Sequence, residues 1–202
     1  MDTLTAILSK VIQLILAVSF HEAAHGFAAY IEGDATAKRA GRLTLNPFKH
    51  LDPVMSILFP LFLISVNSPV VFGAAKPVPV NPYNFKRGNF SQLLVAAAGL
   101  MTNIGLALVN ALCLRLFNAP DIFFETGIII NVALFVFNAI PVPPLDGSRL
   151  AFVFLPASLK KVFIEFEQYG IFLVFLLLYL FGNFIFALVK PLVNIFFLIA
   201  YL

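Results

Sequence analysis

The sequence predicts an all-α, polytopic membrane protein. Hydrophobic residues make up 61% of the 202 residues and charged residues only 11%, whereas soluble globular domains have roughly 45–50% and 25%. Several apolar runs also approach the ~20 residues that a helix needs to cross a bilayer. We therefore expect about five transmembrane helices plus one re-entrant or broken segment. They would form a single membrane-embedded domain over residues 1–202, with its core at about 5–150 and C-terminal helices at about 160–202.

The expected elements follow the apolar runs, which are 5–30, 53–72, 91–117, 122–140, 162–181 and 184–202. Gly182 and Asn183 alone separate the last two runs, which form either a tight hairpin or one helix kinked near Pro191. The loop at 31–52 is polar and basic, and the loop at 73–90 is rich in proline, which disfavours helix in the preceding residue. Within them "GRLTLNP" and "KPVPVN" predict short β-like stretches.

Basic residues are concentrated in three loops. Ten of the thirteen Lys and Arg residues lie in 31–52, 73–90 and 147–161, whereas 118–125 has none. Because basic loops favour the cytoplasm, we place these three loops on the cytoplasmic side. That placement requires the run at 53–72, broken by prolines, to enter and leave on the same face, which is tolerated where protein surrounds the broken backbone. The alternative is a full crossing.

The stretch "SFHEAAHGFAAY" places two histidines and a glutamate inside the first apolar run. His21 and His25 are four residues apart, so both imidazoles lie on one helix face. With Glu22 they form the H-E-x-x-H arrangement, in which two histidines bind zinc and the glutamate is the general base for the zinc-bound water. Ionisable groups cost at least ~2.5–3.5 kcal/mol within a membrane and are therefore usually functional. A hydrogen-bonded polar cluster without metal is the alternative.

A catalytic zinc needs a third protein ligand and an open position. His50, Asp52, Glu32 and Asp34 lie in loops, where a solvated side chain is the ordinary role; for His50 we keep a supporting or gating role as an alternative. Asp146 differs because it ends the proline-rich "FNAIPVPPLDG", where backbone must line a cavity or other protein. From spacing alone Asp146 is either a zinc ligand or the cap of the next helix.

Four motifs together resemble the site-2 protease family of intramembrane zinc metalloproteases, in its compact bacterial and archaeal branch without an appended regulatory domain. These are "HEAAH" (21–25), "NAIPVPPLDG" (138–147), "AAGLMTN" (97–103) and "GAAKPVPVN" (73–81). The likeness runs from about residue 15 to 150. Leu100 replaces a usual proline and Ala74 a usual tryptophan, which affects local geometry or substrate gating and leaves the catalytic positions unchanged.

The resemblance implies a set of roles. His21, His25 and Asp146 would bind one Zn²⁺ per chain, and Glu22 would be the base. Asn138 would lie near the scissile carbonyl or its oxyanion, and Asn103 would support packing or the site. For the ligands to meet, their two helices must point the same way, which again favours a re-entrant 53–72 and puts the zinc on the cytoplasmic side of an inner or plasma membrane.

The expected function is zinc-dependent endopeptidase cleavage within or near transmembrane segments of substrate proteins. The expected partners are such a substrate and the lipid bilayer, with no nucleic acid; the oligomeric state is open. A non-hydrolytic metal-binding scaffold or a metal transporter is the main alternative, although it leaves Glu22 unexplained. A zinc enzyme that acts on a lipid or a soluble peptide is a third.

Overall fold

The computed structural model describes residues 3–58, 62, 65, 75–117 and 121–202. The elements in order are α1 (Thr3–Ile31), α2 (Thr36–Arg39), η1 (Pro47–Lys49), η2 (Pro53–Leu58), η3 (Pro82–Asn84), α4 (Asn89–Phe117), α5 (Ile122–Asn138), α6 (Asp146–Phe154), α7 (Ala157–Glu167) and α8 (Gly170–Tyr201). The all-α class is confirmed. The short β-like stretches are wrong for the described residues, which contain no strand. In 76–81 the backbone N–H groups of Lys76, Val78 and Asn81 donate to His50, Glu22 and Asp34 instead of to a neighbouring strand.

Three described helices, α1, α4 and α8, are long and apolar enough to cross a membrane. α5 is a shorter apolar helix of 17 residues, about 25 Å long at 1.5 Å per residue. The structure therefore supports a membrane protein but not the expected count of five spans. The two C-terminal runs form α7 and one continuous α8 with Pro191 inside it, so of the two alternatives the single helix is the observed one.

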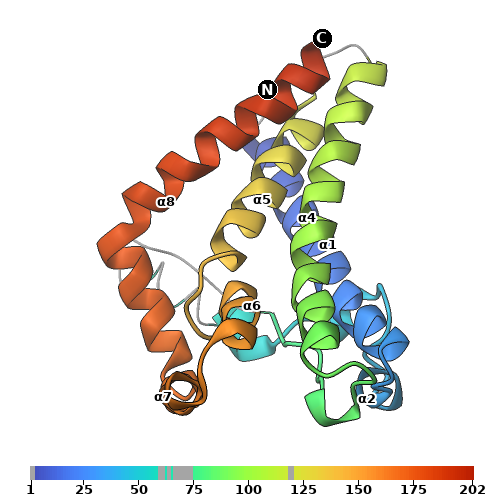
Figure 1. The fold of residues 1–202 in the computed structure, drawn as a ribbon. Coiled ribbons are helices and arrows are strands. Elements are labelled where there is room, and N and C mark those ends of the chain that lie inside the picture. Colours follow the sequence, from blue (N-terminus) through green and yellow to red (C-terminus); the bar gives the residue numbers. More distant parts are fainter. Residues whose placement is uncertain (1–2, 59–61, 63–64, 66–74, 118–120) are drawn as a thin grey trace.

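The helix directions bring the ends of α1 and α5 together. In Figure 1, α1 and α5 run one way while α4 and α8 run the other, so the two termini share one end and α2, α6 and α7 gather at the opposite end. Two parallel helices therefore finish at the same end of the bundle, as a site shared by His21, His25 and Asp146 requires. The predicted relation between the two helices is confirmed.

The described residues that flank the run at 53–72 lie together at one end of the molecule. The Lys76 backbone N–H donates to the His50 carbonyl over 2.9 Å, and Arg87 pairs with Glu32 at the end of α1. The chain thus leaves and returns at the same end, as re-entry needs. Most of the run itself, together with Gly73 and Ala74, lies outside the described residues.

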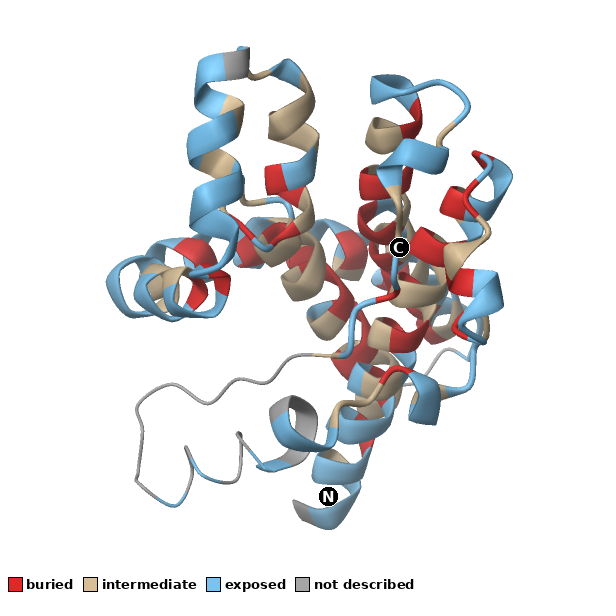
Figure 2. Ribbon diagram, turned by 90° about the horizontal axis from the view of Figure 1, so that it is seen from below, coloured by how far each residue is buried: buried red, intermediate tan, exposed pale blue. Residues whose placement is uncertain are grey.

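The apolar core lies between α4, α5 and α8. It contains Ala111, Leu114, Ile128, Val132 and Val189 among other buried residues, and Figure 2 shows that buried residues gather where the helices face one another while their outward surfaces are exposed. Polar side chains also join α1 to α4 and α4 to α5. Gln13 donates to Asn110, and Asn103 donates to Asn131, over 3.0 and 3.1 Å. Interhelical hydrogen bonds of this kind hold membrane helices together where apolar surface gains little from association.

Candidate metal centre

α1 presents His21 and His25 to α4. Both imidazoles are buried, at 6% and 9% exposure, because the backbone of α4 comes very close at Gly99. A Cβ at Gly99 would lie 2.4 Å from His25 Nε2 and 2.5 Å from His21 Cε1. Only glycine leaves room for the two rings at this crossing. The glycine of the "AAGLMTN" motif is thus a packing residue of the site itself.

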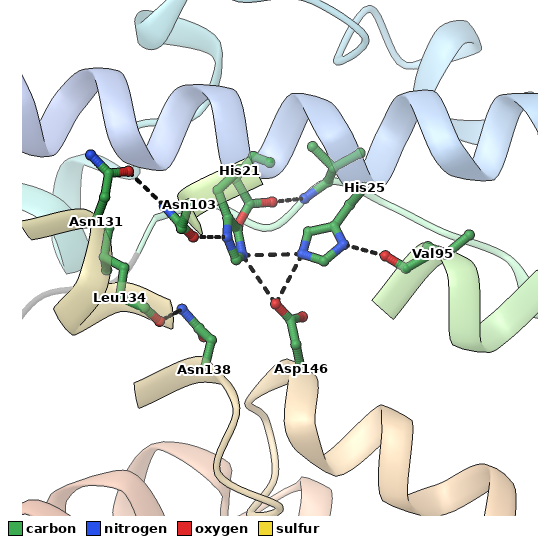
Figure 3. A network of polar contacts seen from close by, with 10 residues as sticks. His21, His25, Val95, Asn103, Asn131, Leu134, Asn138 and Asp146 are labelled. Carbon is green, nitrogen blue, oxygen red and sulfur yellow. Dashed lines mark hydrogen bonds and ion pairs between the residues drawn. The ribbon is translucent and has the colours of Figure 1, made fainter. Parts of the chain in front are cut away.

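Asp146 completes a triangle with the two histidines (Figure 3). Its Oδ2 lies 3.1 Å from His21 Nε2 and 3.1 Å from His25 Nε2, and the two Nε2 atoms are 3.1 Å apart. The residues come from α1 and from the start of α6, 121 positions apart in the chain. These three are the only His, Cys, Asp or Glu side chains among the described residues that gather closely enough to hold a metal ion.

The outer hydrogen bonds fix which ring nitrogens carry protons. His25 Nδ1 lies 2.7 Å from the Val95 carbonyl, which can only accept, so Nδ1 is the donor. His21 Nδ1 lies 2.6 Å from Asn103 Oδ1, and Asn103 uses its amide nitrogen to donate to Asn131. His21 Nδ1 is therefore a donor as well. In neutral imidazoles both Nε2 atoms then carry lone pairs.

Three acceptor atoms consequently converge on one point. Two Nε2 lone pairs and a carboxylate oxygen repel one another unless a cation lies among them. A tetrahedral zinc with bonds of ~2.0–2.1 Å places its ligand atoms about 3.3–3.4 Å apart, close to the observed 3.1 Å. Zinc-binding histidines usually donate their other ring N–H to an oxygen acceptor. Both imidazoles here do so from Nδ1. The donor set therefore fits zinc.

The proline-rich turn after α5 aims Asp146 at the histidines. Asp146 begins α6, whose N-cap is Leu145, and the helix start has no side-chain capping bond. The alternative role of Asp146 as a helix cap is therefore wrong. Gly147 makes the turn possible, since a Cβ there would lie 2.1 Å from the Ala139 carbonyl oxygen. The close backbone approach ties the start of α6 to the end of α5.

Glu22 and Asn138 line the same cavity as the triangle, which measures about 140 Å³. Glu22 Oε2 accepts a 2.8 Å hydrogen bond from the Val78 backbone N–H. Asn138 is half-buried, and its amide donates to the Leu134 carbonyl over 3.0 Å, which leaves its second N–H available. The structure thus brings all five sequence-predicted site residues to one cavity.

The extended segment 75–81, which we call the strap, crosses the site. Val78 is buried, with 7% of its surface exposed, and a Cβ at Gly26 of α1 would lie 3.1 Å from its side chain. Arg42 donates to the Lys76 carbonyl, and Asp34 accepts from the Asn81 backbone N–H. The strap is thereby fixed to the segment that follows α1.

Two buried carboxylates hold this region. A hydrogen bond from Arg87, and then one from Ser91, lower the pKa of Glu32 below its ordinary value of 4.5. Burial opposes ionisation of Asp34, but hydrogen bonds from Asn81 and Thr36 outweigh it, so its pKa lies below 3.8. Both groups are therefore ionised anchors of the fold, and neither lies in the metal site.

His50 is a further correction. The expectation of a solvated loop side chain is wrong, because His50 is 1% exposed. Its Nε2 lies 2.7 Å from the Thr44 carbonyl and its own carbonyl accepts from Lys76. Glu32 and Asp34, at 4% and 0% exposure, are likewise buried. All three form hydrogen bonds between the loop after α1 and the segment that returns to α4. These bonds hold the two segments together, so the three residues are buried.

Three groups around the site escaped sequence reasoning. The Val95 carbonyl and the Val78 N–H are backbone groups, for which no side-chain signal exists. Asn131 did carry a signal, since it is a polar residue in the apolar run 122–140, and such residues in membrane segments usually have a partner.

Comparisons with known proteins agree with the site. The model of "Peptidase family M50" matches residues 116–181, which include Asp146 but not α1. A Bacillus subtilis protein named "Putative zinc metalloprotease YwhC" is 41% identical over 181 residues, covering 84% of this chain and 78% of that protein. A Mycolicibacterium smegmatis protein named "Putative zinc metalloprotease Rip2" is 27% identical over 169 residues, or 81% of this chain; the chain spans 64% of that relative's length. No solved structure gives a significant match.

A helical membrane bundle with this donor set, and with these relatives, is a protease of the metalloprotease class. The chain belongs to peptidase family M50, the site-2 protease family.

Proposed function

We propose that the chain is a zinc-dependent intramembrane endopeptidase that cleaves substrate proteins within or near their transmembrane segments. One observation carries the proposal: two imidazole nitrogens and a carboxylate oxygen converge at 3.1 Å in a cavity that also contains Glu22. The names of the relatives mention zinc, and zinc fits this donor set. One ion per chain would be held by His21, His25 and Asp146.

The position of the triangle supports cleavage at membrane depth. His21 lies ten residues before the end of α1, roughly 15 Å along the helix axis at 1.5 Å per residue. Asn103, its partner, lies near the middle of the 29-residue α4. A bilayer's hydrocarbon core is about 30 Å thick, so ligands at this height lie well inside it.

When bound, zinc polarises the scissile carbonyl and lowers the pKa of its water. Glu22 accepts the proton of the attacking water and passes it to the leaving amine. The Val78 N–H holds the Glu22 carboxylate in place during this transfer. The free N–H of Asn138 donates to the oxygen that gains negative charge.

A helical substrate has to unwind before its carbonyl can reach the site. Strand addition to an extended edge would hold the unwound peptide, but the strap offers little of it. Pro77 and Pro79 have no N–H, and the Lys76, Val78 and Asn81 N–H groups already donate within the protein. Among the backbone N–H groups of the strap, only those of Ala75 and Val80 have no described partner, so side chains near the cavity must contribute to holding the substrate.

The basic loops favour a site on the cytoplasmic side of an inner or plasma membrane. This orientation is tested by labelling single cysteines in intact cells, with Lys76→Cys and Asp121→Cys placed in a Cys113→Ser background. A membrane-impermeant reagent should react from outside with the cysteine at 121 and not with that at 76. Equal reaction at both positions would contradict it.

The main test uses purified protein and a labelled transmembrane peptide. Wild-type protein should cleave the peptide, while Glu22→Gln should retain zinc and lose at least about a thousandfold in rate, because the base is gone. Glu165→Gln, a change of the same kind on an exposed position of α7, is the matched control and should cleave normally. Zinc bound without any cleavage by wild-type protein would favour the scaffold or transporter alternative.

A further inference from the structure

A second cavity of about 290 Å³ adjoins the metal centre. It lies between the strap, the start of α4, α6 and α7. Val80, Pro82, Gln92 and Arg149 line both cavities. The second cavity therefore borders the candidate active site.

Part of the wall of the second cavity is apolar. Phe152 of α6 and Phe163 of α7 face each other with ring centroids 6.0 Å apart, and Ile164 lies beside them. Lys160 places its ammonium group 5.1 Å from the Phe152 ring centre, in a cation–π contact with that ring. Glu167 and Ser148 also line this cavity, and the two phenylalanines with Ile164 form the part of it that suits a large apolar side chain.

Arg149 lies at the border between the two cavities. It follows Asp146 by three residues on α6, so both side chains project from the same helix face. Arg149 forms no hydrogen bond or ion pair with any residue in the described part of the chain. Its guanidinium has five N–H donors, and an unwound peptide brings backbone carbonyls that need donors when water is scarce.

We propose that the second cavity is the subsite for a large apolar side chain of the substrate, Leu or Phe, next to the cleaved bond. Arg149 is a positioning residue that donates to a substrate backbone carbonyl as the peptide passes from one cavity to the other. This inference rests on the proposed function and adds the substrate preference of the same site.

The preference is tested with labelled transmembrane peptides in which each of the residues flanking the cleaved bond is Ala or Phe in turn. At one position, wild-type protein should prefer Phe over Ala by about tenfold or more in kcat/KM, as apolar pockets discriminate by ~10–200-fold per methylene group. Ile164→Trp fills the cavity and Phe163→Ala removes its wall, so both should bring the ratio toward one. Leu159→Trp, an exposed position on α7 outside the cavity, should keep the wild-type ratio.

Arg149 is tested with the same peptides. Arg149→Gln should raise KM about tenfold for both the Ala and the Phe peptide while kcat stays within threefold, because a uniform binding contact is lost. Arg149→Lys should recover part of that loss. Zinc content should equal that of wild-type protein in every variant, which separates a change of binding from a change of fold.

A wild-type enzyme that cleaves the peptides without preference would overturn the subsite, as would a preference that survives both Ile164→Trp and Phe163→Ala. An unchanged KM in Arg149→Gln would overturn the positioning role. Failure of the proposed function is distinct: wild-type protein would then cleave no peptide, or Glu22→Gln would cleave as fast as wild type, and the subsite would fall with it.

Discussion

Gly99→Ala tests the geometry of the metal centre with the smallest possible change. The added Cβ would lie 2.4 Å from His25 Nε2, 2.5 Å from His21 Cε1 and 2.7 Å from His21 Nε2, whereas ordinary contact begins at 3.4 Å. The ring atoms must therefore move by about 1 Å, and metal sites tolerate only about ±0.2 Å in ligand distances. We expect zinc affinity to fall by at least about a hundredfold.

The stability of α4 is expected to change in the opposite direction. Alanine in place of glycine stabilises a helix interior by about 0.5–1 kcal/mol, so the loss cannot come from α4 unfolding. Gly105→Ala is the matched control, because it is on the same helix and its Cβ would meet nothing within 4 Å. Zinc affinity is measured by competition with a chelating dye in detergent. Affinity within threefold of wild type for Gly99→Ala would refute the role of the close crossing.

Further predictions concern Asn103, the hydrogen-bond partner of His21, and the two buried carboxylates Glu32 and Asp34. Asn103→Ala removes the acceptor of His21 Nδ1 and should lower zinc affinity about 10–100-fold, whereas Thr102→Ala on the same turn should not; equal affinities would contradict the assigned tautomer. Because the pKa values of Glu32 and Asp34 are lowered in the folded state, their stabilisation is complete above about pH 4.5 and is lost as the pH falls through the folded pKa values. Melting temperatures followed by circular dichroism should therefore drop steeply in acid for wild type. The Glu32→Gln/Asp34→Asn variant should be less stable near pH 7 and less dependent on pH, and an identical acid profile would count against this interpretation.

Much of the candidate site could be predicted from the sequence because its side chains are chemically out of place. His21, Glu22 and His25 interrupt an apolar run, and a membrane segment rarely carries such groups without a function. Their spacing of one helical turn then predicts a shared face. For Asp146, spacing left a cap as an equal alternative, and only the resemblance favoured a ligand.

The remaining features depend on contacts between distant parts of the chain, which cannot be predicted from a single sequence. His50 looks like an ordinary loop histidine, and its burial follows from the way that 31–52 packs against the strap. The β-like stretches failed because alternation predicts a strand only where a partner strand is available, and Pro77 and Pro79 remove donors from one of the two candidates. The continuous α8 resolves the ambiguity around Gly182, which lies within the helix and forms no turn.

The central claim is that His21, His25 and Asp146 together hold one zinc ion. It is tested most directly by measuring zinc per chain and the zinc X-ray absorption spectrum of purified wild-type protein and of Asp146→Ala. The account predicts one zinc per chain in wild type, coordinated by two imidazoles and oxygen ligands, and a loss of bound zinc in Asp146→Ala. A wild-type protein without zinc, or an Asp146→Ala protein with the same zinc content and spectrum, would contradict it.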